Sequence, residues 1–419
     1  MLGAVSRSRL LPMSLPFRYF GAAVACHALA WGLLLASWKG VPSFEGGLGP
    51  LFAALHLLTL GVLAMSAIGA TLQLLPVATR QPVRALWAVK LVWWLLVPGT
   101  LAFCLGAALY RPHLMNLGAM AVVPALALYA YLLMKNLAGA RGMKVVVAHG
   151  WAALVCLVLL AATGVALAGR YEHGWALDYA ALRSAHLIFA AYGFMGLLSF
   201  GLSTFLLPML AVAPAPPARE VKAGLWLSVI AIVLGAAGFV LPAALLGIVA
   251  AAAHVACMER ALRARLRQPL GQSFLLIRIS WGCLLGSLVV AALMALELAP
   301  ARAPLLFALL LVPGWLLTFL LGVLQRIVPF LASVHASSST RGTPVISALT
   351  PMRLLGAHRM LHLVALSCLF AAALAGLPWL ALIGAAAGLA GALVFAAFFA
   401  FVILKVHHGI QPPHQPAPA

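Results

Sequence analysis

The chain has 419 residues, of which 65% are hydrophobic and only 8% are charged, and its mean hydropathy is +1.12. A soluble protein does not need so much apolar surface, whereas a protein that crosses a membrane many times does. The formal net charge of +20 would suit a nucleic-acid partner, but the basic residues lie in short segments between apolar runs, where they act as topology determinants. The composition therefore argues against nucleic acid as a partner and predicts a polytopic protein of the lipid bilayer.

About twelve apolar runs follow one another along the chain, each close to the ~20 residues that a bilayer-crossing helix needs. The first six cover about 20–38, 50–75, 86–110, 114–133, 145–169 and 185–207. Two more share a tight turn at Leu241-Pro242, and the last four cover about 274–296, 305–331, 355–374 and 380–403. We therefore predict an all-α polytopic membrane protein with about twelve transmembrane helices. A single integral membrane domain spans 1–419, with a flexible cytoplasmic tail at 407–419.

The basic residues predict the orientation. Segments at one face of the membrane hold only five of them, namely Lys39, Arg111, Arg170, Arg183 and Arg302. With Lys90 set aside inside the third run, the other 20 of the 26 Lys and Arg fall near the opposite face. Cytoplasmic segments carry the excess of Lys and Arg. Both termini are therefore predicted to be cytoplasmic, in a bacterial-type inner membrane.

Three of the long runs end alike, and this is the strongest pattern in the sequence. A glycine is followed by six residues and a proline at 69–76, 201–208 and 322–329, with steps of 132 and 121 residues. Recurrence at the same end of three apolar helices is typical of an internal repeat. With one copy on the second run of each group of four, the pseudo-repeats cover roughly 17–140, 141–268 and 269–406. Close helix packing at glycine and helix termination at proline would explain the pattern without any function.

This architecture resembles subunit I of the haem-copper oxidases, and more closely its non-oxidase relatives. These are cytochrome c oxidase subunit I-like membrane proteins of the NnrS type, which respond to nitric oxide. The local matches are Pro16-Phe17-Arg18, the His-Leu-Leu-Thr-Leu-Gly stretch from His56, and the Arg-Ile-Val-Pro-Phe-Leu stretch from Arg326. As architecture, the resemblance covers most of the chain. It implies twelve spans in three four-helix units, with a haem-ligating histidine near the outer end of the second span.

The chain departs from the oxidase pattern where an oxygen-reducing centre would lie. The tenth run has no histidine, and the seventh has no histidine pair. The sixth has His186-Leu187-Ile188-Phe189-Ala190 in place of His-Pro-Glu-x-Tyr. No acidic residue lies deep in a run, so the carboxylate relays usual in proton pumps are missing as well. A terminal oxidase is therefore not expected, and whether the protein is an enzyme stays open.

Histidines inside the apolar runs are the main candidates for cofactor ligands, because ionisable side chains within a membrane are functional by default. His56 and His186 lie 13 and 15 residues before their repeat glycines, and we interpret them as equivalent. The resemblance implies a low-spin haem at this depth, with His56 as an axial ligand of haem b. His186 and the deeper His27 are the further candidates. The alternative is an interfacial histidine that hydrogen-bonds a carbonyl.

Two other groups are candidates for a metal ion. His254, Cys257 and Met258 follow at i, i+3 and i+4, so one helical face offers donors that suit copper as Cu(I). Cysteine and methionine are also ordinary fillers of apolar helices. His358 and His362, at i and i+4, share a face as well. Because they lie near the cytoplasmic end beside two arginines, contact with lipid head groups or a loop is the alternative.

Taken together, these patterns favour a haem- or copper-associated accessory protein in respiratory or nitric-oxide metabolism. Its partners would be respiratory-chain proteins or other haem and copper proteins. The alternative class is a transporter, or a structural membrane partner without a cofactor. A carboxylate inside the membrane or a helix broken at mid-span would favour transport, and neither is clear in this sequence.

Overall fold

The structure is a computed structural model that describes residues 10–175, 177–266, 270–336 and 346–407. Within these ranges every regular element is a helix, and eleven helices are long and apolar enough to cross a membrane. The predicted all-α polytopic membrane protein is therefore confirmed. Residues 337–345, between the tenth and eleventh runs, and the tail beyond His407 lie outside the described residues.

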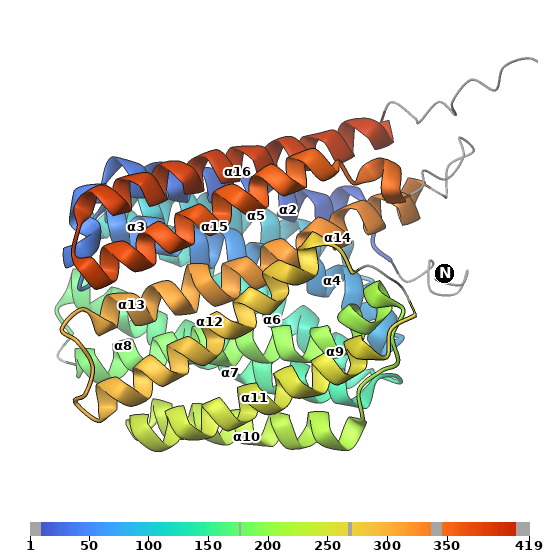
Figure 1. Ribbon diagram of the computed structural model, residues 1–419, viewed down its shortest axis with the longest axis horizontal. Helices are drawn as coiled ribbons and strands as arrows, with labels where there is room; N and C mark the ends of the chain where they lie inside the picture. Colours follow the sequence, from blue (N-terminus) through green and yellow to red (C-terminus); the bar gives the residue numbers. More distant parts are fainter. Residues whose placement is uncertain (1–9, 176, 267–269, 337–345, 408–419) are drawn as a thin grey trace, which may run out of the picture.

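The first group of helices has an order that the other two groups repeat (Figure 1). Helix α2 (Ser14–Ala36) leads through the short 3-10 helix η1 (Trp38–Ser43) into one continuous helix at Pro50–Thr79. That second helix changes form along its length, as α3 (Pro50–His56), η2 (Leu57–Ala64) and α4 (Met65–Thr79). The hairpin of α5 (Leu86–Ala108) and α6 (Pro112–Ala138) completes the group.

The next two groups follow the same order. The second consists of α7 (Lys144–His173), α8 (Tyr179–Ile188), η3 (Phe189–Gly196), α9 (Leu197–Ala211), α10 (Ala218–Ala236) and α11 (Val240–Arg263). The third consists of α12 (Gln272–Ala295), α13 (Ala303–Leu309), η4 (Leu310–Leu317), α14 (Thr318–Ala336), η5 (Ile346–Leu349), α15 (Met352–Ala375) and α16 (Pro378–His407).

Helix α10 accounts for the difference between eleven and the predicted twelve spans. It has 19 residues and forms a hairpin with α11, but its first two turns carry Arg219, Glu220 and Lys222. These charges leave it outside the set of clearly apolar helices, so the number twelve stays a prediction. The turn expected at Leu241-Pro242 is wrong. The chain turns just before Val240, at Gly238 with a φ of +90°, and Pro242 lies in the first turn of α11, where a proline is tolerated.

The three second helices share an unusual internal form. The elements η2, η3 and η4 are π-helical stretches of eight residues each, whereas π-helix is normally rare and limited to single turns. They begin at Leu57, Phe189 and Leu310, which are 132 and 121 residues apart, the same steps as in the Gly–Pro pattern. The repeat prolines lie inside these helices, which continue for three residues or more beyond them. Helix termination is therefore not their role.

The π-helical stretches meet in the interior and pack against the first helix of their own group. Stretch η4 contacts both η2 and η3, while α2, α7 and α12 pack against η2, η3 and η4 in turn. At each of these packings a glycine lies against a cysteine, in the pairs Gly61–Cys26, Gly193–Cys156 and Gly314–Cys283. A β-carbon added to the glycine would lie 2.8, 2.7 and 3.1 Å from the cysteine Cβ, respectively. A side chain at Gly61 or Gly193 would not fit without a shift, and one at Gly314 would be tight, so these three cysteines are packing residues.

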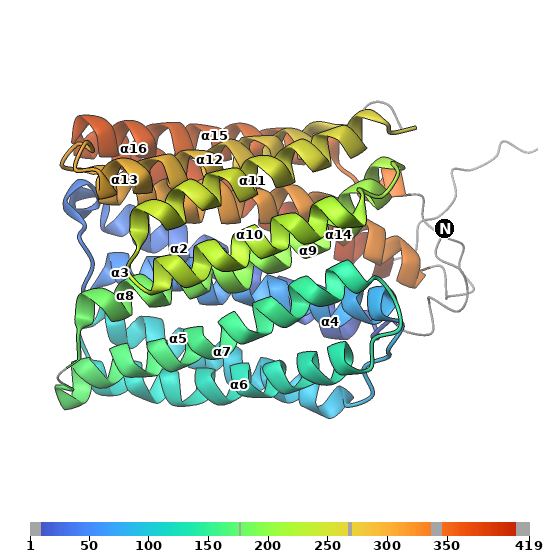
Figure 2. The same cartoon turned by 90° about the horizontal axis from the view of Figure 1, so that it is seen from below.

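Contacts between neighbouring groups also recur. Helix α6 packs against α7, α11 against α12, and α16 against α2, so the groups join in a closed ring. Figure 2 shows α15 and α16 on one side of the molecule and α5, α6 and α7 on the other. Helix α2 begins and α16 ends at the same end of the bundle (Figure 1). The residue limits given above for the pseudo-repeats stay a prediction.

Candidate functional site

His56 ends α3, directly before the π-helical stretch η2. Its Nδ1 lies 3.0 Å from the carbonyl oxygen of Phe52, one turn earlier. The ring lies between those of Phe52 and Phe103, with centroid distances of 4.1 and 5.2 Å. Because a carbonyl only accepts, Nδ1 carries the proton and Nε2 keeps its lone pair. This is the form in which imidazole ligates a metal.

His186 in α8 has a similar arrangement. Its Nδ1 lies 3.2 Å from the Thr163 hydroxyl of α7, which itself donates to carbonyls of its own helix at 2.9 and 3.0 Å. The Thr163 oxygen therefore accepts from Nδ1–H, and His186 also keeps a lone pair at Nε2. His186 lies close enough to His56 for an electrostatic interaction, and both side chains remain partly accessible. The fold thus brings these two predicted ligands together.

The interpretation that His56 and His186 are equivalent is wrong by two positions. His56 immediately precedes its π-helical stretch, whereas His186 lies three residues before the start of η3. A shift of two residues on a helix turns a side chain through about 200°. The two rings therefore do not hold the same place in their groups.

His27 on α2 faces other helices. Trp31 donates its Nε1–H to Nε2 of His27 at 2.9 Å, and the imidazole packs edge-on against Phe395 of α16. Because Nε2 accepts this hydrogen bond, Nδ1 carries the proton, and it is buried without a partner. In this tautomer neither nitrogen offers a lone pair to a haem iron.

His358 and His362 are in the interior, with exposures of 0% and 2%. The expected contact with lipid head groups or a loop is therefore wrong. Nδ1 of His358 lies 3.0 Å from the Gln325 amide nitrogen, and Nε2 of His362 lies 2.7 Å from the Thr318 hydroxyl. Their rings stack with a centroid distance of 5.9 Å. Distance along the chain from a basic end misled the prediction, because α15 turns this face toward α14.

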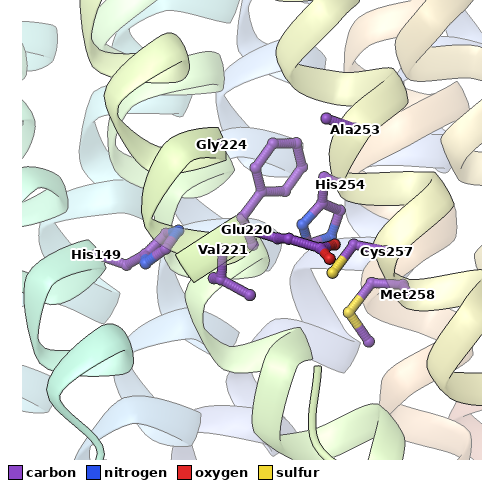
Figure 3. A pocket seen from close by; sticks show the side chains of 9 residues that line it. His149, Glu220, Val221, Gly224, Ala253, His254, Cys257 and Met258 are labelled. Atoms are coloured by element: carbon purple, nitrogen blue, oxygen red, sulfur yellow. The ribbon is translucent and has the colours of Figure 1, made fainter. Parts of the chain in front are cut away.

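A small pocket lies among α7, α9, α10 and α11 (Figure 3). Its volume is about 20 Å³, which is enough for a water molecule or a bare ion. The three residues that the sequence placed on one face, His254, Cys257 and Met258, all line it. His149 of α7 and Glu220 of α10 complete the lining from the facing helices.

His149 and Glu220 were missed by the sequence reasoning because no spacing along the chain connects them to α11. His149 does have a structural counterpart in the first group of helices. The Cβ that alanine would add at Gly201 would lie 2.5 Å from Cβ of His149, just as one at Gly69 would lie 2.8 Å from Cβ of Tyr19. His149 and Tyr19 thus occupy matching places on the first helices of their groups. For Glu220 the sequence holds no comparable signal.

Comparison with known proteins leaves the family undetermined: no protein-family model and no curated protein matches the chain. The resemblance to haem-copper oxidase subunit I therefore rests on the quoted motifs and on the architecture. Within the described ranges, no three His, Cys, Asp or Glu side chains are already gathered in a way that would hold a metal ion. The two arrangements with available donor atoms are the His56–His186 pair and the pocket beside His254.

Proposed function

We propose that this protein is a haem-associated accessory protein of respiratory or nitric-oxide metabolism. It would lie in a bacterial-type inner membrane with both termini cytoplasmic, and serve respiratory-chain or other haem and copper proteins as partners. The observation that carries the proposal is that His56 and His186 lie near each other and share one donor state. Both imidazoles have Nδ1 engaged in a hydrogen bond and keep the Nε2 lone pair.

The donor chemistry of this pair fits haem b. Neutral imidazole is a common axial ligand of haem iron. A ligating histidine usually donates its second ring N–H to a carbonyl or another oxygen, which fixes the tautomer and the orientation of the ring. The Phe52 carbonyl provides this oxygen for His56, and the Thr163 hydroxyl provides it for His186. His56 would be the principal ligand and His186 the second.

The remaining parts of the site have simple roles. Phe52 and Phe103 flank His56 with aromatic surface, which limits the rotation of its ring. A bound haem would supply reversible one-electron chemistry. The protein residues contribute ligation, orientation and an apolar surrounding, all of which tune a haem potential.

The absorption spectrum of the full-length protein, purified from haem-replete cells, tests the proposal. We expect a Soret band and stoichiometric haem in the wild type, and strong loss of both in His56→Ala. His113→Ala is the matched control, because His113 lies at a helix start at the same end of the bundle and is 91% exposed. A haem-free wild type, with His56→Ala indistinguishable from it, would contradict the proposal and favour the transporter or structural alternative.

A further inference from the structure

His149 lines the pocket of Figure 3 from α7. Nδ1 of His149 lies 2.9 Å from the Val145 carbonyl oxygen, one turn earlier on α7. A carbonyl only accepts, so Nδ1 carries the proton and Nε2 keeps its lone pair. The backbone of α7 at this point is held close to α9, because Gly201 leaves room for Cβ of His149. The His149 ring is therefore fixed in both tautomer and position.

His254 brings a nitrogen lone pair to the same pocket from α11. Its Nε2 lies 3.2 Å from the Ser203 hydroxyl, which donates its own proton to the Phe200 carbonyl at 2.8 Å. The Ser203 oxygen must therefore accept from Nε2–H, and Nδ1 of His254 keeps the lone pair. The ring stacks on Phe200 with a centroid distance of 4.0 Å and an interplanar angle of 7°. Stacking and hydrogen bond together hold this ring in one orientation.

Two sulfur donors complete the lining. Cys257 and Met258 are buried, with exposures of 5% and 1%, and both line the pocket. The only carboxylate there, that of Glu220, is paired with the Arg260 guanidinium. Because Glu220 is engaged with Arg260, the donors considered for an ion are those of α11, namely the Nδ1 lone pair of His254, the Cys257 thiol and the Met258 thioether.

We infer that this pocket is a binding site for a soft cation, Cu(I), with Cys257 and Met258 as sulfur ligands and His254 as the nitrogen ligand, and with His149 on the facing wall. Thiolate and thioether donors select Cu(I), whereas Mg²⁺ and Ca²⁺ prefer oxygen. Within the described ranges no three His, Cys, Asp or Glu side chains are gathered so as to hold a metal ion, so His149 is left out of the ligand set, and His254 and Cys257 are its two members of these types. One of its donors is a methionine, and Cu(I) accepts few ligands.

The site is separate from the proposed haem ligands. His149 lies near the start of α7 and His254 in the second half of α11, toward the end of the bundle where α16 ends. His56 lies near the start of the second helix, toward the other end. Loss of one cofactor therefore need not remove the other, and the two proposals can fail independently.

Anaerobic competition between the purified protein and bathocuproine disulfonate for Cu(I) tests the inference. The wild type is expected to take up one equivalent. Cys257→Ser and Met258→Leu are each expected to lower the affinity about tenfold or more, the range seen when metal sites lose a supporting interaction. Cys283→Ser is the matched control, because Cys283 is also a buried helix thiol but packs against Gly314. It should bind Cu(I) like the wild type.

Several results would overturn the inference. These are no Cu(I) uptake by the wild type, equal affinity in Met258→Leu and the wild type, or tighter binding of Zn²⁺ than of Cu(I). Met258→Leu conserves volume and is expected to fold, so the test stands even if Cys257→Ser does not. His56→Ala should keep the wild-type Cu(I) affinity while losing the Soret band, which separates this inference from the proposed haem site.

Discussion

The functional state of each buried histidine is decided by a single neighbouring oxygen or N–H group. A carbonyl or a committed hydroxyl at one ring nitrogen leaves the other as a lone pair, as at His56 and His254. At His27 the indole N–H of Trp31 donates to Nε2, so that lone pair is already occupied. Sequence reasoning located these histidines within the membrane helices. It could not assign the tautomers, because Thr163, Ser203 and Trp31 become partners only through rotamers and through helices that meet in space.

Thr318 provides the residue-scale prediction. It donates to the Pro313 carbonyl at 2.7 Å and accepts from Nε2 of His362 at 2.7 Å. Thr318→Val keeps the shape but leaves two buried polar groups unpaired, which costs about 1–3 kcal/mol for such a group. We expect a lower midpoint of thermal unfolding in detergent. Ser228→Ala, which removes a hydroxyl that bonds only its own helix, should leave the midpoint nearly unchanged, and equal midpoints for both variants would contradict this role.

Among the helices, the second helix of each group shows best what the sequence could and could not predict. The Gly–Pro pattern correctly pointed to three special helices, and their π-helical stretches start at the same steps. The π-helical form itself could not be predicted, because a wholly apolar stretch such as Leu310–Leu317 shows no periodicity that would distinguish an α-helix from a π-helix. The glycine–cysteine packings were missed for a related reason. Each pair joins two different helices, and no spacing along the chain indicates which glycine meets which cysteine.

The glycine–cysteine packings give the element-scale prediction. Gly61→Ala, Gly193→Ala and Gly314→Ala each add a methyl group against a cysteine, and overpacking of this kind costs about 1–3 kcal/mol. All three should lower the thermal midpoint, and Gly314→Ala least, because its cysteine lies 3.1 Å away against 2.8 and 2.7 Å in the other pairs. The control is Gly282→Ala, where nothing lies within 4 Å. If the control falls as far as the others, the close approach is not the cause.

At the scale of the whole molecule, composition and hydropathy predicted the fold class well, because crossing a bilayer imposes long apolar helices on the chain. The count of spans depends on α10, whose first turns are charged. Burial was the weak point. His358 and His362 looked peripheral by their distance from a basic loop, yet they lie in the interior. Distance along a helix gives depth in the membrane, but the face that turns inward depends on the neighbouring helices.

The predicted orientation is open to a direct test by cysteine labelling. Glu45 and Arg141 are exposed and lie in connecting segments at opposite ends of the bundle. Because the end that holds Arg141 carries the excess of basic residues, it is expected to be cytoplasmic. A membrane-impermeant maleimide should therefore label Glu45→Cys in intact spheroplasts, and Arg141→Cys only after permeabilisation. The opposite labelling pattern would show that the chain is inserted the other way round.

The central claim, that His56 and His186 hold a haem between two of the three second helices, is tested most directly by low-temperature electron paramagnetic resonance of the oxidised protein. Two imidazole ligands give low-spin ferric haem, so the wild type should show a low-spin signal. His186→Ala should convert it to a high-spin signal while haem remains, and His56→Ala should lose most of the haem. A wild-type preparation with no ferric haem signal, or a low-spin signal that persists unchanged in both variants, would contradict the account.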